Sequence, residues 1–189
     1  MKRASGVGIA LAAIWVLSGC ALFDSKDDAP TNVSVSDSSA GYALLYELVS
    51  KQKQVDLLAY IKKETPELKA LLERISDASK ATANELEALA KGAPPLNLKL
   101  TQLPKMEQAA RASIEKETSK DILDSKGVDL EFTMLSSQLS GLNYAAHLAR
   151  SLARVESNAS RKAFLQRTDR KYTELHGQVY KIMYTRYKS

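Results

Sequence analysis

The sequence has very few of the side chains from which metal and redox sites are built. Among 189 residues there is one cysteine, Cys20, and there are two histidines. A single thiol excludes an internal disulfide and any Cys-x-x-Cys motif. The Gly-x-Ser-x-Gly, phosphate-loop and His-Glu-x-x-His motifs are absent as well. We therefore expect no catalytic residue and no metal or redox cofactor.

The sequence also lacks a hydrophobic run long enough to cross a membrane. A spanning helix needs about 20 apolar residues, whereas the longest apolar segment covers only residues 7–17. This segment follows the basic residues Lys2 and Arg3 and precedes small residues, which is the order typical of a secretory signal. We assign residues 1–19 to a signal peptide.

The end of this signal resembles the lipobox of bacterial lipoproteins, in the residues Leu17-Ser18-Gly19-Cys20. The resemblance implies that Cys20 becomes the first mature residue and carries a thioether-linked diacylglycerol and an N-acyl chain. Each buried methylene contributes about 0.8 kcal/mol, and two or more chains give stable membrane attachment. Ala21 stands where an aspartate would favour retention in the inner membrane, so the resemblance implies the outer membrane, facing the periplasm. The alternative is an ordinary cleaved signal with a chance cysteine.

The excess of basic side chains is small. The whole chain has 27 lysines and arginines against 22 acidic residues, a net charge of +5. Loss of Lys2 and Arg3 with the signal leaves 25 basic side chains against 22 acidic ones, a net charge of +3. A nucleic-acid-binding protein usually has a concentrated basic face. We therefore expect no nucleic-acid partner.

A polar segment separates the signal from the rest of the chain. Residues 24–39 are almost all small or polar, so they are unable to bury a core. We assign residues 20–40 to a lipidated, disordered tether and residues 41–188 to one helical domain, because the remaining length suits a single core.

After Gly41 the apolar residues recur at helical spacing, and no alternating pattern predicts a sheet. The pattern predicts helices over residues 42–63, 66–92, 104–124 and 128–156, and a last helix from residue 159 almost to the end. Thr65 and Asn158 are the expected N-caps of the second and last helices. The apolar stripes expected to form the core contain Leu45, Leu48, Val49, Val55, Leu58, Leu68, Leu71, Leu72, Ile75, Leu86, Leu89, Leu135, Leu139, Leu142, Ala146, Ala149, Leu152, Phe164, Leu165, Leu175, Val179, Ile182 and Met183.

Two helical hairpins follow from these helices. The turn at Thr65 and Pro66 is so tight that the helices on either side of it must run antiparallel. A connection of 35 residues, 93–127, joins this pair to the second pair. Such a connection is long enough to travel the length of a bundle. We therefore predict an all-α fold, a ferritin-like four-helix bundle of two antiparallel hairpins whose long crossover contains a short extra helix.

Short motifs are spread over both predicted hairpins. They are Thr65-Pro66-Glu67-Leu68-Lys69, Arg74, Asp77, Glu85-Leu86, Leu130-Glu131 and His176. In these residues the chain resembles, over residues 40–187, an exported bacterial ferritin-like family of unknown function. It departs from the family pattern at Ala78-Ser79 and near Asn143, where the family has histidines. The resemblance implies a ferritin-like fold in which two potential metal ligands are missing.

A dimetal centre in such a bundle requires a glutamate from each of two helices and a Glu-x-x-His pair from each of the other two. At that spacing the two histidines, His147 and His176, follow Tyr144 and Thr173. The motif is therefore absent twice, which is a prediction against a ferroxidase centre.

Four polar residues lie on or beside the apolar stripes and form a candidate polar or ligand layer: Asp56, Glu131, Gln138 and His176. Such a layer is able to bind one metal ion or a small ligand weakly. The alternative is that these groups hydrogen-bond to one another or face water at the ends of the bundle.

The last predicted helix has four tyrosines among its lysines and arginines: Tyr172, Tyr180, Tyr184 and Tyr187. Aromatic and basic side chains together suit a surface contact with anionic lipid or cell-wall polymer. The alternative is that the tyrosines border the core while the basic residues face solvent.

We therefore expect a membrane-anchored, periplasm-facing lipoprotein that acts without catalysis as an envelope interaction or structural protein. Its expected partners are the membrane, through the lipid anchor, and an envelope protein or a cell-wall polymer. Two alternatives stay open. One is a ferritin-like metal-binding or redox protein with a degenerate site that uses Glu131 and His176, and the other is a carrier of a small ligand or lipid.

Overall fold

The computed structural model describes residues 34–56 and 65–188, and in these ranges it contains five helices and no strand. The helices are α1 (Val35–Gln52), α3 (Pro66–Ala90), α4 (Lys105–Asp124), α5 (Gly127–Val155) and α6 (Ala159–Tyr187). The prediction of an all-helical fold is confirmed for this part of the chain. None of these helices combines the length and the apolar character that a membrane span needs.

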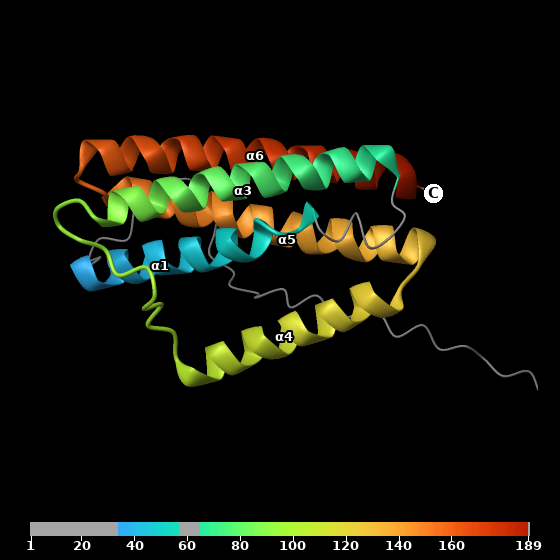
Figure 1. Ribbon diagram of the computed structural model, residues 1–189, viewed down its shortest axis with the longest axis horizontal. Coiled ribbons are helices and arrows are strands. Elements are labelled where there is room, and N and C mark those ends of the chain that lie inside the picture. Colours follow the sequence, from blue (N-terminus) through green and yellow to red (C-terminus); the bar gives the residue numbers. More distant parts are fainter. Residues whose placement is uncertain (1–33, 57–64, 189) are drawn as a thin grey trace, which may run out of the picture.

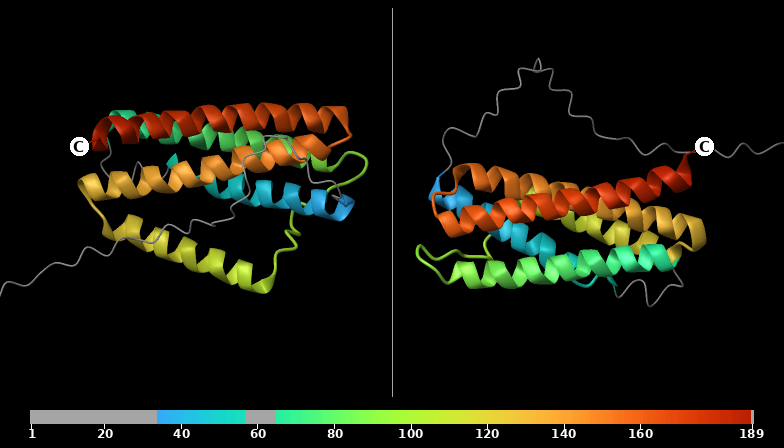
Figure 2. Two further views of the ribbon diagram at one scale, coloured as in Figure 1. Left: turned by 180° about the vertical axis from the view of Figure 1, so that it is seen from behind. Right: turned by 90° about the horizontal axis from the view of Figure 1, so that it is seen from above.

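Four of the helices pack side by side into a helical bundle (Figure 1). Helix α1 contacts α3 and α5, and α6 contacts the same two helices from the other side, so the four form a closed ring. Neighbours in the ring run antiparallel, and α3 and α5 run in the same direction (Figures 1 and 2). Helix α4 lies outside the ring and leads the chain back along its length.

The predicted apolar stripes form the core. Most of their leucines and valines are fully buried, as are Phe164 and Ile75. Burial of one such side chain contributes about 1.5–3 kcal/mol relative to leaving it in water. Leu48, Leu139 and Met183 are only partly buried and pack against the edge of the core. Leu58 was also expected in the core and lies outside the described residues.

The expected caps confirm where α3 and α6 begin. The Thr65 side chain accepts a hydrogen bond from the backbone N–H of Leu68, and the Asn158 side chain accepts one from Arg161. Helix α4 begins within one residue of the predicted start and ends where predicted, so the extra helix of the crossover has 20 residues. Ile122 is the only residue of α4 that is buried.

Helix α1 begins seven residues earlier than predicted, so residues 35–40 are helical and do not belong to a tether. The reason is a capping box: the Asp37 N–H donates to Ser34 Oγ at 3.0 Å, and the Ser34 N–H donates to Asp37 Oδ2 at 3.1 Å. The rest of the predicted tether and the predicted signal with Cys20 lie outside the described residues.

Helix α1 also ends earlier than predicted, at Gln52 and not near residue 63. The N–H of Val55 donates to the Gln52 carbonyl at 3.1 Å, which makes a tight turn. The carbonyl of Lys53 accepts a hydrogen bond from Ser76 Oγ of α3 at 2.7 Å. A side chain from the neighbouring helix thus satisfies a carbonyl left free at the helix end. Residues 57–64 lie outside the described part of the chain.

A buried arginine fixes the start of the crossover. Arg161 is 3% exposed, and its guanidinium donates to the carbonyls of Leu89 at 3.2 Å, Gly92 at 3.3 Å and Pro94. No basic residue lies in the last turn of α3 itself. The side chain from α6 therefore satisfies the carbonyls at the C-terminal end of α3 and holds the departing chain against α6.

Tyr172 is buried, which corrects the prediction that it belongs to an exposed tyrosine surface. Its side chain is 0% exposed, and its hydroxyl lies 3.1 Å from Ser79 Oγ of α3. Tyr172 precedes Leu175 and Val179 at helical spacing, so it continues the apolar stripe of α6. The hydroxyl is satisfied by Ser79 where the two helices meet.

The two most buried tyrosines predict a loss of stability at alkaline pH. Burial raises the pKa of Tyr172, and burial together with the hydrogen bond to Glu156 raises the pKa of Tyr42. A raised pKa in the folded state gives stability that is present below the unfolded pKa of about 10 and is lost as the pH rises above it. We expect the free energy of unfolding, measured in urea, to fall between pH 9 and 11 by less in Tyr172→Phe than in the wild type. Tyr180→Phe, at an exposed position, should leave the fall unchanged, and equal falls in all three proteins would contradict the prediction.

Candidate functional site

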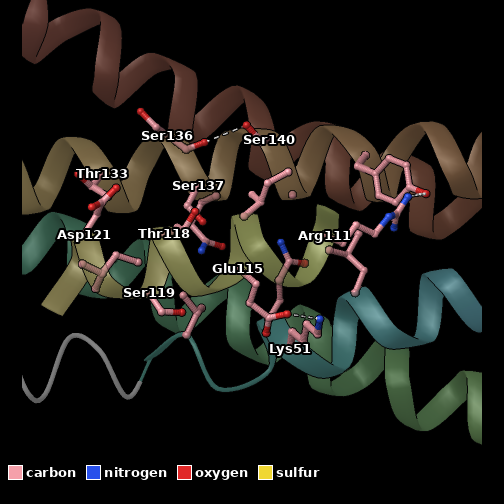
Figure 3. Close-up of a pocket in the computed structure, with 18 of the residues that line it drawn as sticks. Lys51, Arg111, Glu115, Thr118, Ser119, Asp121, Thr133, Ser136, Ser137 and Ser140 are labelled. Carbon is pink, nitrogen blue, oxygen red and sulfur yellow. Dashed lines mark hydrogen bonds and ion pairs between the residues drawn. The ribbon is translucent and has the colours of Figure 1, made fainter. Parts of the chain in front are cut away.

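A groove lies between α1, α4 and α5, on the side of the ring that α4 covers (Figure 3). Its volume is about 800 Å³. Pockets that bind small molecules usually have volumes of about 300–1,000 Å³. The groove is therefore large enough for a small organic ligand, and we treat it as the candidate site.

Two polar bridges tie α4 to the ring across the groove. Lys51 Nζ of α1 lies 2.6 Å from Glu115 Oε2 of α4, and it also pairs with Glu47 at 3.1 Å (Figure 3). Arg111 of α4 donates to the Tyr144 hydroxyl at 3.3 Å, and its guanidinium carbon lies 5.4 Å from the centre of the aromatic ring of Tyr144. Exposed ion pairs contribute about 0–1 kcal/mol each. Helix α4 is thus held less firmly than the helices of the ring.

The basic side chains of the groove are already paired. Partial burial opposes protonation of Lys51, but the hydrogen bonds to Glu115 and Glu47 outweigh it and raise the pKa of this lysine. Arg111 pairs with Glu107 at 2.7 Å. Both cations therefore stay protonated and engaged with acidic partners of this chain.

The walls of the groove are mostly apolar, with a row of hydroxyl groups on α5. The apolar side chains are Leu44, Leu48, Val55, Ile114, Ile122 and Phe132. Ile114 and Phe132 are 63% and 48% exposed, so large hydrophobic surfaces border the opening. The hydroxyls come from Thr133, Ser136, Ser137 and Ser140 (Figure 3). The groove thus offers an apolar surface with polar groups along one side.

Two buried glutamines line the groove with an acceptor that has no partner. Gln52 of α1 is 7% exposed and Gln138 of α5 is 8% exposed. The Oε1 atom of each is buried and accepts no hydrogen bond. Gln52 lies against α5 at Gly141, where a Cβ atom would come within 2.8 Å of its Nε2. A buried acceptor without a partner costs about 1–3 kcal/mol, so each of these two side chains lowers the stability of the fold.

The four residues of the predicted polar layer lie in different surroundings. Gln138 lines the groove, and Asp56 pairs with Lys80 of α3 at 3.3 Å. Glu131 forms an ion pair with Arg186 of α6, which also contacts Glu67 at 2.6 Å. His176 is partly buried on α6. Within residues 34–56 and 65–188, no three histidine, cysteine, aspartate or glutamate side chains gather where they could hold a metal ion.

Only two of the four predicted surface tyrosines are exposed. Tyr180 and Tyr184 stack with their ring centres 6.2 Å apart, and Lys188 Nζ lies 5.0 Å from the ring centre of Tyr184. Tyr187 is partly buried and packs edge-on against Phe132 at 5.3 Å. Of the predicted tyrosine surface, only Tyr180 and Tyr184 with the neighbouring Lys188 are therefore exposed.

Sequence reasoning identified Gln138 but missed the groove and the role of Gln52. Gln52 interrupts the apolar stripe of α1, and this interruption was the available signal. The groove itself depends on where α4 lies, which no local pattern reveals.

The chain was compared with models of protein families, with curated proteins and with solved structures, and none of them matches it. The resemblance of the sequence to the exported ferritin-like family therefore stays a prediction.

Because the Gln138 acceptor has no partner, we expect an apolar side chain of similar size at this position to make the folded protein more stable. Gln138→Met removes the buried acceptor and keeps the volume, so we expect the free energy of unfolding to rise by about 1 kcal/mol or more. Gln166→Met, at an exposed position of α6, is the matched control and should change it by less than about 0.5 kcal/mol. Urea denaturation measures both, and a clear loss of stability in Gln138→Met would show that the amide is satisfied.

Proposed function

We propose that this protein is a lipid-anchored lipoprotein of the bacterial envelope that acts by binding, without catalysis, and that the groove between α1, α4 and α5 is its binding site. The observation that carries the proposal is the pair of buried, unpartnered acceptors of Gln52 and Gln138 in this groove. Destabilising polar groups that line a pocket are typical of sites kept for a ligand. In this proposal the protein faces the periplasm from the outer membrane and contacts an envelope component there.

The anchor is supported by the sequence Leu17-Ser18-Gly19-Cys20. Cys20 lies 14 residues before Ser34, the N-cap of α1. A fully extended chain covers about 3.5 Å per residue, so an acyl anchor on Cys20 would keep the start of α1 within about 50 Å of the membrane surface. The groove would then lie close to envelope lipids and to other anchored proteins.

A binding role also suits the chemistry of the groove. Its lining offers amides, hydroxyls and apolar side chains, and its cations Lys51 and Arg111 are paired with acidic residues. Such a set fixes the orientation of a ligand through hydrogen bonds and covers its apolar part. The groove thus also favours the second candidate, a carrier of a small ligand or lipid.

We also propose that the helical bundle is a ferritin-like four-helix bundle. It is supported by the direction of the chain: α3 and α5 run the same way, and α4 makes the long return between them (Figure 1). In this proposal the ion pairs of Arg186 with Glu131 and Glu67 occupy one end of the bundle.

The lipid anchor predicts a defined mass for the mature N-terminus. We expect mass spectrometry of the protein from membranes to find a diacylglycerol and an N-acyl chain on Cys20, and a tagged fatty acid fed to the cells to label the protein. Cys20→Ser should abolish this labelling, because serine lacks the thiol to which the lipid is attached. An unmodified Cys20 thiol in the wild type, or full labelling of Cys20→Ser, would contradict the anchor.

The binding site predicts contacts that depend on position along α4. Ile114 lines the groove, whereas Met106, which is 81% exposed on the same helix, does not. A photo-crosslinking amino acid introduced at each position in turn tests this in intact cells. We expect a defined adduct from position 114 and none from position 106. No adduct from position 114, or the same adducts from both, would contradict the groove as the site.

A further inference from the structure

We infer that the groove takes an uncharged amphiphile, an acyl chain whose head group donates hydrogen bonds, as in a monoacylglycerol. This inference rests on the proposed function in one respect, that the groove is the binding site. It adds the chemical class of the ligand, which follows from the charge, the hydrogen-bonding groups and the apolar surface of the groove.

The charge of the groove disfavours an ionised ligand. Its lining contains two basic residues, Lys51 and Arg111, and three acidic residues, Glu47, Glu115 and Asp121. Both basic side chains are already paired, Lys51 with Glu115 at 2.6 Å and Arg111 with Glu107 at 2.7 Å. An anionic head group would compete with Glu115 and Glu107 for these two cations and would meet the acidic side chains. A cation would be drawn to carboxylates at the rim, but it would leave the deeper amides unused.

Four oxygen atoms of the groove lining are available as acceptors. The Oε1 atoms of Gln52 and Gln138 are buried and unpartnered. The hydroxyls of Thr133 and Ser140 donate to the backbone carbonyls of Asp129 at 2.9 Å and Ser136 at 3.2 Å. Their protons are therefore engaged, while their oxygens stay able to accept. A ligand group that complements these four acceptors must donate, which a hydroxyl or an amide N–H does and a carboxylate or phosphate ester does not.

The rest of the groove matches an apolar chain. Leu44 and Leu48 come from α1, Val55 comes from the turn that follows it, and Ile114 and Ile122 come from α4. Ile114 and Phe132 are exposed large hydrophobic side chains in the described part of the chain, and both line the groove. An acyl chain would remove them from water. The combination of a donor head group and an apolar chain selects a neutral lipid over a sugar or a charged metabolite.

A pair of photoactivatable lipids tests this inference on the full-length protein in membranes. One probe is a monoacylglycerol with a diazirine in its acyl chain, and the other is the fatty acid with the same chain. We expect the monoacylglycerol to label peptides of α4 and α5 around Ile114 and Phe132 at least fivefold more than the fatty acid does. Equal or stronger labelling by the fatty acid, or labelling confined to the exposed Tyr180 and Tyr184, would overturn the inference.

Two sets of variants show whether the contacts are the ones described. Gln52→Leu with Gln138→Leu keeps the groove apolar and removes both acceptors, so labelling by the monoacylglycerol should fall at least fivefold. Since this change lies in the core, a second variant, Ile114→Asp, places a charge at the exposed edge of the groove and should cause a similar loss. Met106→Asp is its matched control on α4 and should stay within twofold of the wild type. Wild-type labelling of Ile114→Asp, or of a folded double variant, would overturn the inference.

Failure of this inference is distinguishable from failure of the proposed function. A specific adduct from position 114 to a protein or polymer, without labelling by the monoacylglycerol, would overturn the neutral lipid and leave the binding groove in place. The absence of both the adduct and the labelling would overturn the groove itself.

Discussion

The long return between α3 and α5 is the constraint on which the other features depend. Because these helices run in the same direction, the chain has to travel back along the bundle before α5 begins (Figure 1). Helix α4 forms this return, but it buries only Ile122 and so has no apolar stripe that could pack into the core. It is held at the side of the ring by Lys51–Glu115 and Arg111–Tyr144. The groove is the space that this arrangement leaves between α4 and the ring.

Polar groups inside the bundle fall into two kinds, and the difference points to the site. Arg161 satisfies carbonyls at the end of α3, and Tyr172 meets Ser79 between α3 and α6. These groups add specificity to the packing. Gln52 and Gln138 instead leave their acceptors unpartnered along the groove. The unpartnered acceptors of Gln52 and Gln138 thus lower the stability of the fold along a groove between three helices, which is where a binding function would need them.

Local signals in the sequence were enough for most of the fold. Thr65 and Asn158 mark helix starts because their side chains accept backbone hydrogen bonds, and leucine spacing identifies the buried faces. The start of α1 was missed because its capping box uses Asp37 where glutamate is usual. Tyr172 was misplaced because lysines and arginines surround it in the sequence, although helical spacing puts it among the buried residues. The groove could not be predicted, since it depends on how far α4 lies from the ring.

Hydrogen exchange along the full-length protein tests most directly whether α4 lies outside the core. A helix held by a few polar bridges opens far more readily than helices that share a buried interface. We therefore expect backbone amides of residues 105–124 to exchange at least tenfold faster than those in the centres of α5 and α6. Protection of residues 105–124 equal to that of α5 and α6 would show that α4 is packed into the core, and it would contradict a groove between them.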